Sequence, residues 1–190
     1  MNMTRWILLL ALVPGVANAQ TAKPSAAAPK PQETASADVV SADPQSTSAA
    51  YGDWVHVCQR AGEPPQKICE VSQSVQLQGQ SGPIAQLALG KTPGSTALHL
   101  TILLPPSVTL TTAPRVAADD KNTDAVDVPW ARCLPGGCFA DVAVKDDIIK
   151  RWRAQPSRGQ IAFKDALGRN VLLPISFKGL TQALDALAKE

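Results

Sequence analysis

The fold class of this chain is decided by one stretch of sequence, Cys69-Glu70-Val71-Ser72-Gln73-Ser74-Val75-Gln76-Leu77. Its odd-numbered positions are mostly apolar and its even-numbered positions are polar. This two-residue period is typical of a strand that buries one face. Because an apolar sheet face must be covered by a second layer, a chain that repeats such strands predicts packed antiparallel sheets.

Shorter strand patterns lie on both sides of this stretch. They cover residues 54–58, 84–89, 98–104, 108–110, 115–117, 128–133, 138–144, 161–164 and 171–173, and Ile175 and Phe177 continue the inward face of the last one. Turn residues such as those at 79–83 and at Pro105-Pro106 separate the strands. Many short strands with turns between them predict a mostly β, antiparallel β-sandwich.

Two short helices are expected to interrupt the strands. Asp146-Asp147 opens the first with two carboxylates, which are favourable near a helix N-terminus. An apolar stripe of Ile148, Ile149 and Trp152 follows. The second helix is expected at 181–189, directly after Gly179.

The N-terminus has the pattern of a cleavable signal peptide over residues 1–19. One positive charge precedes an apolar run, which ends at Pro14-Gly15, and Ala17-Asn18-Ala19 matches a cleavage site. The alternative is a membrane anchor, but the apolar run is far shorter than the roughly 20 residues that span a bilayer. We therefore expect cleavage after Ala19 and a protein in the periplasm or secreted to the cell surface.

The next segment, residues 20–50, is rich in Ala, Pro, Ser, Thr and Gln and has no aromatic residue. Such a stretch cannot bury enough apolar area to offset its ordering entropy, so it is expected to be a disordered linker. The folded domain is then 51–190. The formal net charge of the chain is +2, which gives no reason to expect a nucleic acid as a partner.

The four cysteines occur in two close pairs, Cys58 with Cys69 and Cys133 with Cys138. In an exported domain an even number of cysteines predicts disulfides, and four cysteines allow three connectivities. The Leu-Pro-Gly-Gly turn can bring Cys133 to Cys138, which favours the two local pairs. Zinc sites and redox centres use shorter spacings or nearby histidines, so no metal and no cofactor are expected.

Four segments carry a resemblance to a known family. They are Trp54-x3-Cys58 with Cys69 and Gln73; the run Leu-Leu-Pro-Pro-Ser-Val-Thr-Leu at 103–110; Arg132-Cys133-Leu134-Pro135-Gly136-Gly137-Cys138; and Ser-Phe-Lys-Gly-Leu-Thr-Gln-Ala-Leu at 176–184. In this order they resemble the invasion-associated locus B family of exported bacterial proteins, over essentially all of 51–190. Ser107 departs from the pattern, because a glycine is expected after the proline, and this puts the local turn geometry in doubt.

The resemblance implies an immunoglobulin-like β-sandwich in the periplasm or at the cell surface. It also implies an association with host-cell invasion in some intracellular pathogens. Because similar proteins are widespread in bacteria that invade nothing, the family name does not state the activity of this chain.

Three large or polar residues within the strand patterns are expected to be structural. Trp54 and Trp130 are expected in the core, because aromatic side chains dominate core burial. Gln73 is a polar residue on an apolar face. It either hydrogen-bonds buried backbone groups or lines a small pocket, and the first is favoured.

The two histidines offer little sign of a site. His99 lies on the polar face of its strand without an evident acidic partner, so it is expected to be solvated. His56 shares a face with Trp54 and Cys58, and packing near a disulfide is a better account of it than catalysis.

One cluster of charges has a possible function, namely Lys150, Arg151, Arg153 and Arg158. It could receive an anionic lipid headgroup, a polysaccharide or an acidic partner. The alternative, which is favoured, is a solvated helix end whose cations complement the helix dipole.

No recognisable catalytic set is found in the sequence, which lacks a triad context, a phosphate-binding loop and a metal box. The acidic loop with Asp119, Asp120 and Asp124 lacks the order of a calcium loop. We therefore expect a binding or envelope-accessory module with an unknown envelope or host protein as its partner. The alternative is a periplasmic hydrolase or isomerase with an unrecognised site.

Overall fold

The computed structural model describes residues 44–92, 94–118, 125–155 and 158–190. The expected signal peptide, most of the expected linker and the acidic loop at 119–124 lie outside the described residues. Among the described residues, no helix has the length and apolar character needed to cross a membrane.

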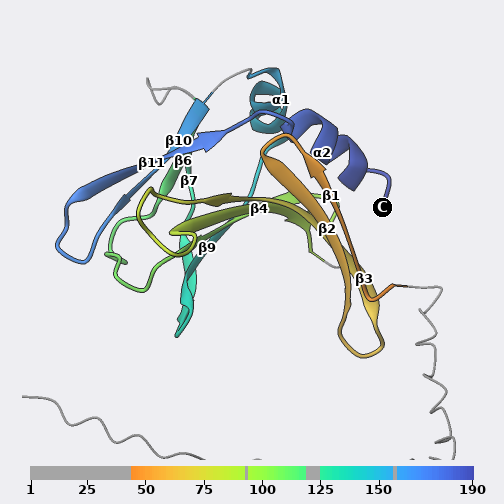
Figure 1. Cartoon of the computed structure of the whole chain (residues 1–190), viewed down its shortest axis with the longest axis horizontal. Coiled ribbons are helices and arrows are strands. Elements are labelled where there is room, and N and C mark those ends of the chain that lie inside the picture. Colours follow the sequence, from red (N-terminus) through yellow and green to blue (C-terminus); the bar gives the residue numbers. More distant parts are fainter. Residues whose placement is uncertain (1–43, 93, 119–124, 156–157) are drawn as a thin grey trace, which may run out of the picture. The chain divides into compact units, whose positions relative to one another are not determined.

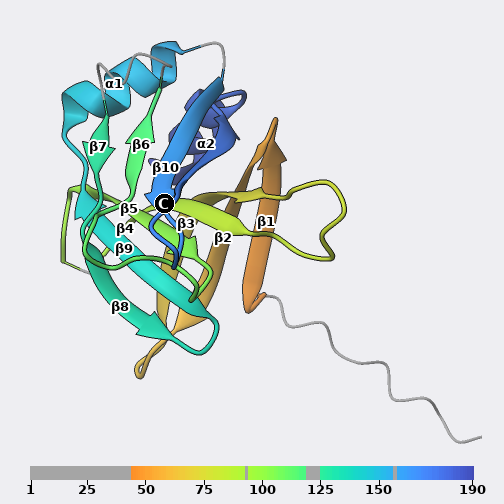
Figure 2. The ribbon, with the colours of Figure 1, turned by 90° about the vertical axis from the view of Figure 1, so that its left-hand side faces the viewer.

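Seven strands form the larger sheet, and all its neighbours are antiparallel. They are β1 (Ser46–Tyr51), β2 (Trp54–Ala61), β3 (Gln66–Val75), β4 (Ala85–Lys91), β5 (Leu98–Leu104), β8 (Trp130–Leu134) and β9 (Gly137–Ala143). Their order is β1-β2-β3-β4-β5-β9-β8. Because most consecutive strands pair, the sheet is largely a meander, and β1 and β8 are its two edges (Figure 2).

The smaller sheet has the order β11-β10-β6-β7. It consists of β6 (Arg115–Ala117), β7 (Val126–Asp127), β10 (Arg158–Lys164) and β11 (Asn170–Ser176). The helices are α1 (Asp146–Ala154) and α2 (Leu180–Leu187).

One hydrophobic core lies between these layers. The smaller sheet covers one part of the inner face of the larger sheet, and α2 packs on β1, β2 and β3 at the other part (Figure 1). Fully buried residues come from the larger sheet, the smaller sheet and α2, among them Leu87, Leu89, Leu100, Ile102, Ile161, Leu173 and Leu180. The expected mostly β, antiparallel sandwich with two short helices is thereby confirmed.

The expected boundary at residue 50 is wrong, because β1 already begins at Ser46. Every residue of β1 pairs with β2, from Ser46 opposite Gln59 to Tyr51 opposite Trp54. Its side chains are nearly all exposed, so backbone pairing at a sheet edge forms this strand without any apolar periodicity.

Two further expectations about strands are corrected. Residues 108–110 are not a strand, since Val108 makes only an isolated bridge to Asp165. The strand that contains Gln73 ends at Val75, and Leu77 beyond it is 42% exposed. At Leu77 the apolar alternation continues past the end of the hydrogen-bonded ladder, so the pattern predicts a longer strand than the structure has.

The tryptophans do not all behave as expected. Trp54 is 1% exposed and belongs to the core, as predicted. Trp130 is only half-buried, because it lies on the edge strand β8, and its Nε1 donates to the Thr112 carbonyl oxygen at 3.0 Å. Trp152 is buried as expected, with its ring centroid 5.8 Å from that of Phe177.

Candidate functional site

Both local disulfides are formed. Cys58 on β2 lies directly opposite Cys69 on β3, and the two are bonded. Cys133 and Cys138 are bonded across the turn between β8 and β9. The first disulfide lies beside a pocket and the second lies on an edge hairpin, so the two pairs have different surroundings.

Gln73 sits in a closed network, which we call the junction and define by Asp53, Trp54, Gln73 and Ser176. The Gln73 amide donates to the carbonyl oxygens of Asp53 (3.2 Å) and Ser176 (3.1 Å), and it accepts from the Ser176 N–H (2.9 Å). The Trp54 indole also donates to Ser176 O at 2.8 Å. The prediction that Gln73 binds backbone groups is confirmed, and it also contributes to the wall of an open groove.

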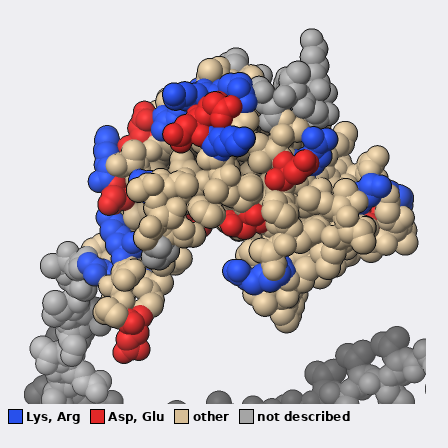
Figure 3. Space-filling model, turned by 180° about the vertical axis from the view of Figure 1, so that it is seen from behind, with Lys and Arg blue, Asp and Glu red and all other residues tan. Residues whose placement is uncertain are grey.

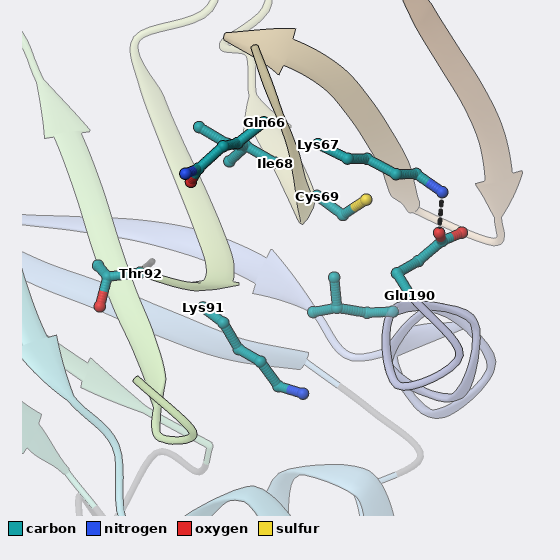
Figure 4. Close-up of a pocket in the computed structure, with 8 residues that line it drawn as sticks. Gln66, Lys67, Ile68, Cys69, Lys91, Thr92 and Glu190 are labelled. Carbon is teal, nitrogen blue, oxygen red and sulfur yellow. Dashed lines mark hydrogen bonds and ion pairs between the residues drawn. The ribbon is translucent and has the colours of Figure 1, made fainter. Parts of the chain in front are cut away.

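A second polar group lies on the same inner face of β2 and β3. The buried His56 ring has its Nε2 3.5 Å from the Cys58 sulfur. Next to the disulfide is a pocket of about 200 Å³, which we call the disulfide pocket, lined by Gln66, Lys67, Ile68, Cys69, Lys91, Thr92, Leu187 and Glu190. Figure 4 shows Glu190, just after α2, reaching Lys67 beside the Cys69 sulfur.

The charges in the disulfide pocket act on Glu190. The hydrogen bond from the Lys67 ammonium lowers the pKa of the Glu190 carboxyl. Desolvation raises this pKa in part, and the positive charge of Lys67 and an interaction with His56 lower it further. The donor atoms of His56, Cys58, Cys69 and Glu190 all lie within 4.8 Å of one another. The spacing of these residues in the sequence does not indicate the group, because Glu190 lies far along the chain from the β2–β3 hairpin.

The interpretation of His99 as a histidine without an acidic partner is wrong. Its Nδ1 lies 3.1 Å from Asp141 Oδ2, and Thr101 Oγ1 donates to Asp141 Oδ1 at 2.9 Å. Asp141 comes from β9, which pairs with β5 and places Thr101 opposite Asp141. The acidic partner could not be found from the sequence, because strand pairing brings together residues that are 42 positions apart.

These three residues lie on the outer face of the larger sheet, away from the core. They line a groove of about 200 Å³ together with Ile68, Cys69, Glu70, Ala88, Gly90, Lys91 and Thr92. The Thr101 hydroxyl donates to Asp141 and not to the histidine, so the pair does not activate it as a nucleophile. The arrangement is suited to hydrogen bonding with a bound partner.

The four cations of the expected patch have different surroundings. On α1, Arg151 pairs with Asp147 (3.1 Å), and Arg153 pairs with Asp185 (2.6 Å). Arg158 is not on the helix but begins β10, while Lys150 is exposed on α1. Figure 3 shows basic and acidic side chains next to one another over the face that it displays. Carboxylates thus offset part of the positive charge of this cluster.

Comparisons with known proteins agree with the fold. A family model described as "Invasion associated locus B (IalB) protein" matches residues 54–188. The crystal structure of invasion associated protein b from Bartonella henselae superposes with a TM-score of 0.64 at 16% sequence identity, covering 75% of this chain and 95% of that chain. At this identity the superposition supports the fold alone. No curated protein matches the chain.

Proposed function

This chain belongs to the invasion associated locus B family, and we propose that it is an exported cell-envelope protein that works by binding another protein of the envelope. The observation that carries the proposal is the outer face of the larger sheet. Among the described elements, both helices and the smaller sheet lie on the opposite, inner side (Figure 1). The outer face is therefore available to a partner.

The centre of this outer face is built from small side chains. Strand register places Ser72, Ala88, Thr101 and Asp141 in one row across β3, β4, β5 and β9. A neighbouring row contains Glu70, Gly90 and His99 in the same way. Small residues let a partner come close to the sheet, and the flanking polar groups can fix its orientation.

A pull-down with matched variants tests this face. We would immobilise the mature protein, expose it to an envelope extract from its native cell and identify bound proteins by mass spectrometry. Ala88→Arg places a long cation at the centre of the outer face. Leu172→Arg makes a matching change on β11, where Leu172 is 61% exposed. We expect Ala88→Arg to reduce recovery of the partner at least tenfold and Leu172→Arg to leave it unchanged.

Two results would contradict the proposal. One is a wild-type protein that recovers no reproducible partner, and the other is an Ala88→Arg variant that recovers the same partner in the same amount. Circular dichroism before each experiment establishes that both variants are folded. The enzyme alternative would gain support if small molecules from the extract were consumed by the wild-type protein and not by His99→Ala.

The proposed location needs a separate test. Cell fractionation followed by N-terminal sequencing should give a protein in the periplasmic or extracellular fraction that begins at Gln20. A chain that keeps its first 19 residues and sediments with the membrane would replace export with anchoring.

A further inference from the structure

We propose that reduction of the Cys58–Cys69 disulfide creates a zinc-type metal site beside the disulfide pocket, with His56, Cys58, Cys69 and Glu190 as ligands. Each residue offers one donor atom, and the four atoms lie within 4.8 Å of one another. This inference does not depend on the proposed binding function of the outer sheet face.

The donor set consists of ligand types that bind zinc. Two thiolates, one imidazole and one carboxylate give four ligands of the types found in tetrahedral zinc sites. Ligand bonds of about 2.0–2.3 Å put neighbouring donors roughly 3–4 Å apart in such a site. Side-chain rotations that move the donor atoms by about 1 Å would therefore bring Glu190 and His56 to the metal, while the two sulfurs move apart.

The scaffold holds most of this set in place. His56 and Cys58 lie on one face of β2, and Cys69 lies directly opposite Cys58 on β3, so three donors come from one rigid hairpin. His56 and Cys58 are 7% and 3% exposed, whereas Glu190 is exposed. The site would thus be closed on the side of the core and open toward the pocket, which provides an entry path for an ion.

The charges would also balance after an ion has bound. A divalent ion with two thiolates and one carboxylate carries one net negative charge. Lys67, which now donates to Glu190, would remain beside the site as a compensating cation. The hydrogen bond of Lys67 is to Oε2 of Glu190, so the other carboxylate oxygen is the one offered to the metal.

The redox step needs a dithiol reductant, such as an extracytoplasmic thiol–disulfide oxidoreductase. Its thiolate attacks the Cys69 sulfur, which lines the pocket, and the sulfur–sulfur bond breaks. Cys58 leaves as a thiolate next to His56 and takes up a proton. The second thiol of the reductant resolves the mixed disulfide, so the reductant becomes a disulfide and two cysteine thiols remain. Metal binding then releases the two thiol protons.

The other disulfide provides an internal control. In the described parts of the chain, Cys133 and Cys138 belong to no comparable group of metal-binding side chains. Reduction opens both disulfides, so metal binding that needs only free thiols should occur at both cysteine pairs. A response that needs His56 and Glu190 appears only at the first.

The test uses the full mature chain with no residues added after Glu190, reduced with a phosphine and titrated with Co²⁺. We expect one equivalent to give sulfur-to-cobalt charge-transfer absorption with the visible bands of a tetrahedral ion, and Zn²⁺ should displace it. Cys133→Ser/Cys138→Ser should retain this spectrum, and Cys58→Ser/Cys69→Ser should lose it. His56→Ala and Glu190→Gln should each weaken binding at least tenfold.

Several outcomes would overturn the proposal. They are a cobalt spectrum without sulfur charge transfer, the same spectrum in Cys58→Ser/Cys69→Ser, and unchanged affinity in both His56→Ala and Glu190→Gln. Thermal unfolding covers the case in which reduction loosens the fold. Zn²⁺ should raise the Tm of the reduced wild type and not that of the reduced Cys58→Ser/Cys69→Ser variant. A reduced chain that unfolds and is not restored by metal would also reject the site.

Discussion

Polar residues lie on the inner face of β2 and β3 both at the junction and beside the disulfide pocket. The two regions differ in the hydrogen-bonding partners that these residues have. At the junction, the amide of Gln73 meets backbone groups of Asp53 and Ser176. At the pocket, His56 meets a sulfur atom, a weak acceptor, and Glu190 meets a lysine near solvent. Polar groups with fixed backbone partners stabilise a fold, whereas polar side chains that face one another can exchange partners.

Gly179→Ala should produce the largest effect in the molecule. Gly179 has a φ of 89°, and an added Cβ would lie 1.9 Å from the Tyr51 carbonyl oxygen. The β1–β2 turn and the start of α2 would have to separate, which strains the hydrogen bond from Asp53 N–H to Lys178 O. We expect a loss of about 3–4 kcal/mol of unfolding free energy, measured by urea denaturation.

Gly168→Ala is the matched control for this change. Gly168 also has a positive φ, of 77°, but an added Cβ would meet no atom within 4 Å. Only the left-handed backbone conformation is then penalised, at about 1 kcal/mol. Equal losses in the two variants would mean that the close approach of Gly179 to Tyr51 does not hold α2 on the first hairpin.

Gln73→Leu tests the hydrogen bonds of the junction. The Asp53 carbonyl and the Ser176 N–H would lose their Gln73 partner, while the Ser176 carbonyl would keep the Trp54 indole. Both groups are part-buried, and each unpaired group costs about 1–3 kcal/mol, so we expect a loss of about 3 kcal/mol in total. Gln86→Leu, on the half-buried outer face of β4, should change stability by less than about 0.5 kcal/mol.

The core of the fold could be predicted from the sequence because its signals are local. The alternation at Cys69–Val75 and at Leu98–Leu104 reflects burial of one sheet face. Each strand shows this alternation in its own residues, so no distant contact is needed to predict it. The strand β1 could not be predicted, because its exposed side chains show no apolar alternation that would indicate pairing. Trp130 looks like a core residue in sequence, and only its place on an edge strand leaves it half-exposed.

The candidate sites depend on contacts between distant residues, and the sequence could reveal only half of each. Gln73 stands out as a polar residue on an apolar face, but Ser176, its partner, lies 103 positions away. The strand pattern places His99 on a polar face, but nothing in the sequence indicates that Asp141 is its partner. A local pattern gives the direction in which a side chain points, whereas its partner depends on sheet order and register.

The two disulfides can be compared by removing each one. Sequence separations of 11 and 5 residues predict that Cys58→Ser/Cys69→Ser costs roughly 3 kcal/mol and Cys133→Ser/Cys138→Ser roughly 2 kcal/mol. Urea denaturation under non-reducing conditions measures both. The second variant should still recover the envelope partner well below its new midpoint. Lost recovery by a folded Cys133→Ser/Cys138→Ser protein would make the β8–β9 turn part of the binding site.

The smallest effect is expected at Lys67, which is part of the disulfide pocket. The Lys67 hydrogen bond lowers the pKa of Glu190, so this pair stabilises the fold when the carboxylate is ionised. A carboxyl with a lowered pKa in the folded state contributes its full stability above its unfolded pKa. It loses this contribution as the pH falls through the lowered pKa of the folded state.

Lys67→Met should therefore lower stability slightly at neutral pH and reduce the loss of stability between neutral pH and pH 3, measured as Tm by circular dichroism. Lys91→Met, which lines the same pocket, should retain the wild-type pH dependence. Because both variants remove one positive charge, a difference between them reports the pairing of Lys67 with Glu190 and not the net charge. Identical pH profiles would mean that Lys67 does not hold the Glu190 carboxylate in the folded protein. Glu190 could then exchange partners freely, in contrast to Gln73, whose backbone partners are fixed.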